Sequence, residues 1–195
     1  MIKSIYRKLR YNESEYYPQT RSKPSNLIDV VSAWKGNELI IKDIINFSKI
    51  KTDKCLEFGV DNAFSTVAFS NYFNKVTGVD IFTGDDHSGT HTDDYENVKK
   101  SVEAFDNIEL VKADYKDFIK NNDEFYDLIH VDIVHSYEDT YRCGLWAAEH
   151  SDCTLFHDTI SFMEVIKAVK DISKKTNKQF YHFREFYGLG ILCNK

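Results

Sequence analysis

Residues 55–66 read Cys55-Leu56-Glu57-Phe58-Gly59-Val60-Asp61-Asn62-Ala63-Phe64-Ser65-Thr66, an apolar run that carries one acid and is followed by a glycine and a helix start. Gly59 lets the backbone approach a ligand where a Cβ atom would collide, and the amides at the start of the next helix favour a carboxylate or a phosphate. The dinucleotide fingerprint G-x-G-x-x-G is absent. The stretch therefore predicts a nucleotide-type cofactor bound at the end of a first β-strand.

Strand and helix signals alternate along the chain on both sides of this stretch. Strands are predicted near residues 54–58, 75–80, 108–113, 126–132, 153–157, 179–184 and 188–193, and helices near 26–33, 37–50, 63–73, 93–105, 115–121, 136–149 and 161–174. This alternation gives parallel strands with helices on both faces, and ligands then bind beyond the carboxyl ends of the strands. We expect one three-layer α/β/α domain over residues 26–195, with a mostly parallel seven-stranded sheet and an antiparallel C-terminal strand.

The charge of the chain is divided unevenly between its start and its body. The net charge is −6, and residues 1–10 carry four cations, which leaves about −10 on the remainder. Residues 1–25 contain both prolines and are predicted to be a basic arm or linker rather than a second domain. The acidic body argues against a nucleic-acid partner, although basic residues of the arm, with Arg21 and Lys23, keep RNA as an alternative.

The cysteine spacing and the hydropathy of the chain bear on its cellular compartment and on whether it crosses a membrane. The cysteines lie singly, without a C-x-x-C pair that would hold zinc or a redox centre, so a reducing cytoplasm is the simplest location. There is no apolar stretch of about 18 residues and no signal-peptide core, so no membrane span is expected. Residues 1–10 form either a short membrane-surface helix or a solvated, frayed terminus. The sequence does not fix the oligomeric state, and a homo-oligomer is one option.

An acid closes, or nearly closes, each of the five central strands. These acids are Glu57, Asp80, Asp114, Asp132 and Asp158. The simple interpretation of any one of them is a helix cap or a solvated turn.

Two capping patterns bear on which of these acids are free for chemistry. Ser161 and Glu164 form a capping box that would release Asp158 from capping the next helix. Ser136 can cap the helix that follows it, which would leave His135 just outside the helix and facing the site.

Asp132 and Asp158 are expected on neighbouring strands. Such strands lie about 4.8 Å apart, so the two carboxylates could share one ion. Oxygen ligands of this kind favour Mg²⁺ or Mn²⁺ over zinc. His157 is either a third ligand or a hydrogen-bonded core residue, and His130 is predicted to be a core residue. The alternative is that Asp132 contacts the amino group of a cofactor and Asp158 a backbone amide.

The segment after Asp80 is long for a strand-to-helix connection. It is rich in glycine, aspartate and histidine and contains Asp85, His87 and His91. Long connections in compact domains are often functional, so we predict a substrate loop or lid. The alternative is a solvated loop whose glycines only turn the chain.

Glu57 two residues before Gly59, together with Asp80 at the end of the next strand, resembles the S-adenosylmethionine (SAM) site of the Rossmann-like class I methyltransferases. Further motifs appear in the same order as in the small Methyltransf_24-type enzymes, which are often found beside glycosyltransferases. These motifs are Gly84-Asp85-Asp86-His87-Ser88-Gly89, His130-Val131-Asp132-Ile133-Val134-His135-Ser136-Tyr137-Glu138, Phe156-His157-Asp158-Thr159 and Gly188-Leu189-Gly190. The resemblance covers residues 37–193, and Ala63 stands where such proteins usually have a second glycine.

The resemblance implies roles for individual residues. SAM would be bound by Glu57, Gly59, Asp61, Ser65, Asp80, Ile81, Asp114 and Tyr115. By similarity to macrolide-sugar O-methyltransferases, Asp132 and Asp158 would be metal ligands and His135 the base. The acceptor would be a saccharide or another small hydroxylated molecule. The competing hypotheses are an RNA or protein methyltransferase and a non-catalytic SAM-fold scaffold in a glycan-enzyme complex.

Overall fold

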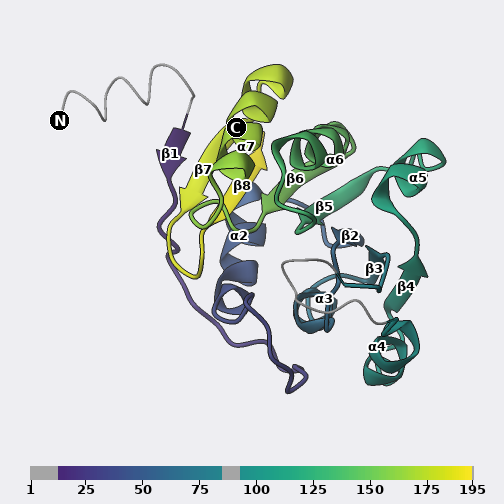
Figure 1. Ribbon diagram of the computed structural model, residues 1–195. Helices are drawn as coiled ribbons and strands as arrows, with labels where there is room; N and C mark the ends of the chain where they lie inside the picture. The colour runs from purple at the N-terminus through teal and green to yellow at the C-terminus, as the bar shows by residue number, and fades with distance from the viewer. Residues whose placement is uncertain (1–12, 85–92, 195) are drawn as a thin grey trace.

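The computed structural model describes residues 13–84 and 93–194, which fold around one eight-stranded sheet (Figure 1). In spatial order the strands are β1 (Glu13–Glu15), β7 (Gln179–Phe183), β8 (Leu189–Cys193), β6 (Ser151–Phe156), β5 (Tyr126–Val131), β2 (Lys54–Phe58), β3 (Lys75–Asp80) and β4 (Ile108–Lys112). Strand β8 runs antiparallel to β6 and β7, and the other pairings among the described strands are parallel. The predicted mostly parallel sheet with an antiparallel C-terminal strand is confirmed.

Helices cover both faces of the sheet and complete the three predicted layers. One face carries η1 (Asn37–Ile40), α2 (Ile41–Ser48), α3 (Phe64–Ser70) and α4 (Tyr95–Ser101), and the other carries α5 (Tyr115–Lys120), α6 (Tyr137–Glu149) and α7 (Met163–Thr176). Successive residues of a strand point to opposite faces, so Cys55 packs in the first of these layers and Leu56 in the second. The central strands are therefore buried on both faces, and their carboxyl ends are left for a site.

The sheet has one strand more than the sequence predicted. Residues 13–15 lie in the stretch predicted to be an arm or linker, but they form β1 and pair in parallel with β7. The segment Glu-Ser-Glu is short and lacks alternating apolar residues, so it carries no strand signal. Its register is supported instead by long-range contacts, among them an ion pair of 3.2 Å between Lys170 Nζ and Glu13 Oε2.

The helix predicted near residues 26–33 is wrong, because this segment forms neither helix nor strand. Its backbone bonds to side chains of other elements instead of to itself. The Asn71 side chain accepts from the amide of Asn26 at 2.8 Å and donates to the carbonyl of Asn26 at 2.8 Å. The Asn62 amide donates to the carbonyl of Val31 at 3.4 Å. These contacts fix an extended segment beside α3.

Among the residues that the structure describes, no helix has both the length and the apolar composition needed to cross a bilayer. Residues 1–10, expected to form either a solvated, frayed terminus or a short membrane-surface helix, lie outside the described residues.

Candidate active site

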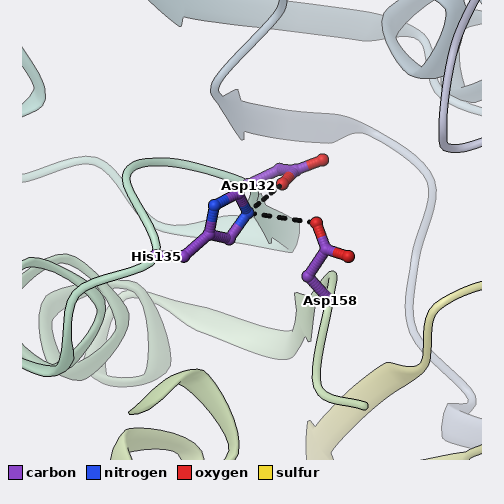
Figure 2. A group of neighbouring side chains, drawn as sticks. All are labelled: Asp132, His135 and Asp158. Atoms are coloured by element: carbon purple, nitrogen blue, oxygen red, sulfur yellow. Dashed lines mark ion pairs between the residues drawn. The ribbon is translucent and has the colours of Figure 1, made fainter. Parts of the chain in front are cut away.

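The loops after β5 and β6 bring together four ionisable side chains, which we call the acid–histidine cluster: Asp132, His135, His157 and Asp158. Strands β5 and β6 are neighbours, with Val131 opposite Phe156, as the sequence predicted. His135 Nε2 lies 3.0 Å from Asp158 Oδ2 and 3.7 Å from Asp132 Oδ1 (Figure 2). The carboxylates of both acids therefore converge on one imidazole.

His135 reaches this position because it lies just before α6. Ser136 is the N-cap of that helix, and its hydroxyl accepts from the amide of Asp139 at 3.0 Å, as predicted. The ring of His135 stacks on Phe162, with 4.0 Å between ring centroids and 5° between planes. One face of the imidazole is thus fixed by the aromatic ring, and Nε2 points at the two acids.

Asp158 occupies its position for a different reason from the one predicted. The Ser161–Glu164 capping box is wrong, because Phe162 is the N-cap of α7 and no side chain caps that helix. Asp158 instead adopts a left-handed backbone with φ 60°, and its carbonyl accepts from the amide of Phe162 at 3.0 Å. This turn at the end of β6 presents the carboxylate to His135.

His157 lies beneath the two acids on the buried side. Its side chain is 1% exposed, and Nδ1 lies 3.2 Å from Asp132 Oδ2 and 3.2 Å from Asp158 Oδ2. Its Nε2 has no hydrogen-bond partner among the described residues. His157 therefore supports both carboxylates, and its role as a third ligand stays a prediction.

The two acids and the two histidines of the cluster shift one another's pKa values in opposite directions. Burial alone would lower the pKa of His135, but Asp132 and Asp158 raise it to about 9. Burial would likewise lower the pKa of His157, but the same two acids raise it to about 10. Burial would raise the pKa of Asp158, but the two histidines lower it to about 2, and they hold the pKa of Asp132 well below its ordinary value. At neutral pH, two imidazolium ions thus neutralise two carboxylates.

The donor set fits a hard divalent cation. Asp132, His135 and Asp158 each offer one ligand atom, and these atoms lie within 4.8 Å of one another. A space of about 10 Å³ behind the cluster is lined by Asp132, His135 and His157 together with Val131, Ile133, Thr140 and Val165, and Asp158 does not line it. The two carboxylate oxygens suit Mg²⁺ or Mn²⁺, and His135 Nε2 either completes the ligand set or exchanges a proton beside it. A cation would replace the positive charge that the protonated imidazoles now supply.

The glycine loop after β2 lies next to the acid–histidine cluster. Gly59 has φ +87°, and a Cβ there would lie 1.7 Å from the carbonyl oxygen of Asp132. The sequence argument assigned this glycine to the close approach of a ligand, whereas the structure shows a close approach to the backbone of Asp132. Ala63 also adopts a left-handed conformation, with φ 61°, which is why glycine is common at such a position.

Asp80 organises the same loop from the end of β3. Its Oδ2 accepts from the amides of Val60 at 2.7 Å and Asp61 at 3.2 Å, and its Oδ1 accepts from the amide of Phe82 at 2.7 Å. Ile81, the next residue, is 42% exposed. The carboxylate thus ties two strand ends together at the position predicted for the cofactor ribose.

Glu57 lies apart from this surface, in a buried chain of hydrogen bonds. The side chains of Glu57 and His130 are 0% exposed, and His130 Nδ1 lies 2.9 Å from Glu57 Oε1. Thr66 Oγ1 donates to the other oxygen of Glu57, and Trp34 Nε1 donates to His130 Nε2 at 3.1 Å. His130 is therefore a core residue, as predicted, and both oxygens of Glu57 have partners within the protein. Direct contact of Glu57 with a cofactor stays a prediction.

Asp114 and Tyr115, also predicted to bind cofactor, have local partners as well. Asp114 caps α5 and accepts from the amide of Lys116 at 2.7 Å, while the Tyr115 hydroxyl donates to Asp139 at 2.7 Å. Ser65 is buried in the first turn of α3. The predicted substrate-loop residues Asp85, His87 and His91 lie outside the described residues.

Sequence reasoning missed two aromatic residues, one that stacks on His135 and one in the buried chain of hydrogen bonds at Glu57. The role of Phe162 was not predicted because Ser161 and Glu164 resemble a capping box. The one local indication is that an aromatic residue directly precedes a helix. Trp34 anchors the segment before η1 by its bond to His130, and nothing in the local sequence predicts a partner so distant.

Comparison with known proteins agrees with this arrangement. Residues 56–159, just over half of the chain, match the family model described as a methyltransferase domain. No curated protein matches the chain in sequence. Among solved structures, a putative O-methyltransferase from Klebsiella pneumoniae is similar with a TM-score of 0.59 and 14% identity, over 87% of this chain and 84% of that one.

Two further solved structures show the same fold. A methyltransferase from Podospora anserina with bound S-adenosylhomocysteine (SAH) has a TM-score of 0.61 and 12% identity, over 85% of this chain and 80% of that one. A putative rRNA methylase from Clostridium thermocellum has a TM-score of 0.58 and 14% identity, over 86% of this chain and 100% of that one. At these identities the likeness concerns the fold alone.

Proposed function

Because the chain belongs to the methyltransferase domain family and is a SAM-dependent methyltransferase, we propose that it methylates a hydroxyl group of a saccharide or a similar small hydroxylated acceptor, with the help of a divalent metal ion. The observation that carries the proposal is the convergence of Asp132 and Asp158 on His135 at the carboxyl ends of two adjacent strands. A hydroxyl oxygen is a poor nucleophile at neutral pH, so it needs both a charge partner and a base. His135 would supply the base, and Asp132 and Asp158 would hold the cation that acts as the charge partner.

The proposed reaction is an in-line attack of the acceptor oxygen on the methyl carbon of SAM. The oxygen–carbon bond forms as the carbon–sulfur bond breaks, which leaves SAH, and the hydroxyl proton passes to Nε2 of His135. Asp132 and Asp158 would hold Mg²⁺ or Mn²⁺, which would lower the pKa of the acceptor hydroxyl. The binding residues would need to align the reacting atoms at about 3–3.5 Å.

His135 must be neutral to accept this proton. The two carboxylates raise its pKa to about 9, so it is an acid rather than a base while it is their only charge partner. When Asp132 and Asp158 bind a cation instead, the pull of their charges on the imidazole proton is relieved. The imidazole can then return toward its ordinary pKa of about 6.5, which suits a general base.

The cofactor is proposed to lie over the loops after β2 and β3. Gly59, Asp61 and Ser65 belong to the first of these loops and the helix after it, while Asp80 ends β3 and Ile81 begins the second loop. In that position the exposed side chain of Ile81 would pack against the adenine, and the Asp80 carboxylate would exchange amide partners for the ribose hydroxyls. Asp114 and Tyr115, at the start of α5, would border the adenine.

A methyl-transfer screen with labelled SAM tests the proposal. Candidate acceptors are sugars, sugar nucleotides, small phenols and RNA, each with Mg²⁺, with Mn²⁺ and with EDTA. We expect label in a saccharide or small hydroxylated acceptor only when the metal is present. Transfer to RNA alone would contradict the saccharide proposal and favour the RNA alternative. Full activity in EDTA after dialysis would show that the reaction needs no metal ion.

Cofactor binding is tested separately by calorimetry with SAM and SAH. Asp80→Ala is expected to weaken binding by about 1–3 kcal/mol, because hydroxyls would be left without a partner. Asp117→Ala, at an exposed position of α5, is the matched control and should bind as the wild type does. If the folded wild type binds neither SAM nor SAH at millimolar concentration, the proposed SAM-dependent reaction is contradicted.

A further inference from the structure

Four exposed apolar side chains belong to the chain segments that carry the acid–histidine cluster or contact it. Val134 is 44% exposed, Ile160 45%, Met163 76% and Tyr187 58%. Val134 precedes His135 in the chain, Ile160 follows Asp158 by two residues, and Met163 follows the phenylalanine that stacks on His135. Isolated exposed apolar residues need no explanation, but several beside one polar cluster indicate a binding surface.

Tyr187 is the aromatic member of this group, and it contacts the cluster. Its ring centroid lies 6.4 Å from that of His157, with an interplanar angle of 75°. His157 in turn contacts both Asp132 and Asp158 at 3.2 Å. The exposed ring of Tyr187 is therefore one side chain away from both acids.

The backbone that carries Tyr187 is strained. Phe186, Tyr187 and Gly188 are left-handed in succession, with φ of 48°, 68° and 91°. This conformation is unfavourable for a residue with a Cβ, and strain of this kind concentrates at functional sites. The strain requires a cause in the surrounding structure.

Packing explains the conformation of Phe186 but not the exposure of Tyr187. The ring of Phe186 packs on Gly36, where a Cβ atom would lie 2.4 Å from the ring. The ring centroids of Phe186 and Phe183 are 6.2 Å apart. The adjacent ring of Tyr187 turns outward and stays more than half exposed.

The turn that bears Tyr187 is fixed to the turn that bears Asp158. The amide of Ile160 donates to the carbonyl of Tyr187 at 2.9 Å, and the amide of Thr159 donates to the carbonyl of Gly188 at 3.3 Å. A Cβ at Gly188 would lie 2.7 Å from the amide nitrogen of Ile160. The position of the Tyr187 ring is therefore set relative to the acids.

We propose that Tyr187 is the aromatic platform of an acceptor subsite that takes a hydroxylated six-membered ring. The apolar face of that ring would lie on Tyr187, with Val134, Ile160 and Met163 at its rim, and a ring hydroxyl would reach Asp132, His135 and Asp158. A saccharide with axial C–H bonds and a phenol share this chemistry. The inference rests on the proposed function and adds the shape of its acceptor.

The test measures binding of simple probes in the presence of SAH and Mg²⁺. The probes are methyl glucopyranoside, catechol and the acyclic polyol mannitol, and saturation-transfer NMR reports the affinity of each. Tyr187→Ala removes the platform and Tyr187→Phe keeps it. Tyr17→Ala is the matched control, because Tyr17 is 71% exposed and follows the edge strand β1.

We expect a ring probe to bind the wild type and Tyr187→Phe, and its affinity to fall about three- to tenfold in Tyr187→Ala. The Tyr17→Ala control should match the wild type, and mannitol should not respond to Tyr187→Ala. The two ring probes distinguish a saccharide from a phenolic acceptor. Equal affinities in wild type and Tyr187→Ala, or no binding of either ring probe at tens of millimolar, would overturn the inference.

SAH calorimetry on the same samples separates this inference from the proposed function. If SAH binds wild type and Tyr187→Ala equally while the ring probes do not respond to the substitution, the platform alone is wrong. If SAH does not bind the wild type, the proposed function is contradicted, and the platform inference that rests on it is contradicted as well.

Discussion

At the scale of single residues, His135 has two kinds of contact that act in different ways. Phe162 fixes the plane of the imidazole from one side, while Asp132 and Asp158 act on Nε2. Stacking sets orientation, and the carboxylates set protonation. A base that is both oriented and adjustable in charge suits a reaction in which a proton leaves as a bond forms.

Replacing His135 should therefore affect turnover far more than folding. We expect His135→Gln to lower the rate of methyl transfer by about 10²–10⁴, the usual cost of removing a general base. Binding of SAH should be retained. His150→Gln is the matched control, because His150 stacks on Trp146 at 4.3 Å at the other end of α6. Turnover of His135→Gln within about threefold of wild type, far from the loss of a base, would place the base elsewhere.

The sequence predicted some residues of the site and not others, for physical reasons. Asp132, His135 and Asp158 were predictable because the ends of parallel strands meet at one edge of the sheet. The bond between Glu57 and His130 and the bond from Trp34 to His130 were not, because these residues are far apart in sequence and meet only in the packed core. Side-chain networks of this kind depend on tertiary packing that a local pattern does not encode.

At the scale of elements, β1 shows how a strand can form without a strand signal. Glu13 is buried at the sheet edge, where Lys170 Nζ lies 3.2 Å, Arg184 Nη2 3.3 Å and His182 Nδ1 3.5 Å from its carboxylate. His182 Nε2 is also 2.9 Å from Thr159 Oγ1. The edge strand is therefore connected through His182 to the residue that follows Asp158. The central strands, by contrast, were predicted within one or two residues because their apolar runs are long.

The stability that Glu13 provides should depend on pH. The hydrogen bond from His182, acting against burial and together with Lys170, lowers the pKa of Glu13 from 4.5 to about 2. Its contribution is therefore fully present above about pH 4.5 and is lost as the pH falls toward 2. We expect Glu13→Gln to lower the free energy of unfolding by about 1–3 kcal/mol at pH 7, and the difference from wild type to shrink toward pH 3.

Urea denaturation at pH 7, 5, 4 and 3 measures this difference. Glu15→Gln is the matched control in the same strand, because the Glu15 side chain is 50% exposed and its loss should change little. A constant gap between wild type and Glu13→Gln over this range would show that the carboxylate charge is not what holds β1.

At the scale of the whole molecule, the acid–histidine cluster links folding to protons and to metal. In the metal-free protein the pKa of His135 is raised to about 9 and that of His157 to about 10. A histidine with a raised pKa contributes stability that is fully present below its unfolded value of about 6.5 and is lost as the pH rises through the folded pKa. The metal-free protein should thus lose stability between about pH 6.5 and 10.

A divalent cation should reverse this loss, because it replaces the positive charge that the imidazoles give up. At about 100 times its dissociation constant, Mn²⁺ should stabilise the fold by about 2.7 kcal/mol, which raises Tm by about 5–10 °C for a chain of this size. The increase should be larger at pH 8 than at pH 6, where protons compete with the ion. Thermal unfolding with Mn²⁺ and with EDTA at both pH values measures it. Asp158→Asn should abolish the increase, and Asp117→Asn, on the exposed side of α5, should keep it. An increase that survives in Asp158→Asn, or that is greater at pH 6, would mean that the ion binds away from the acids on which the proposed chemistry depends.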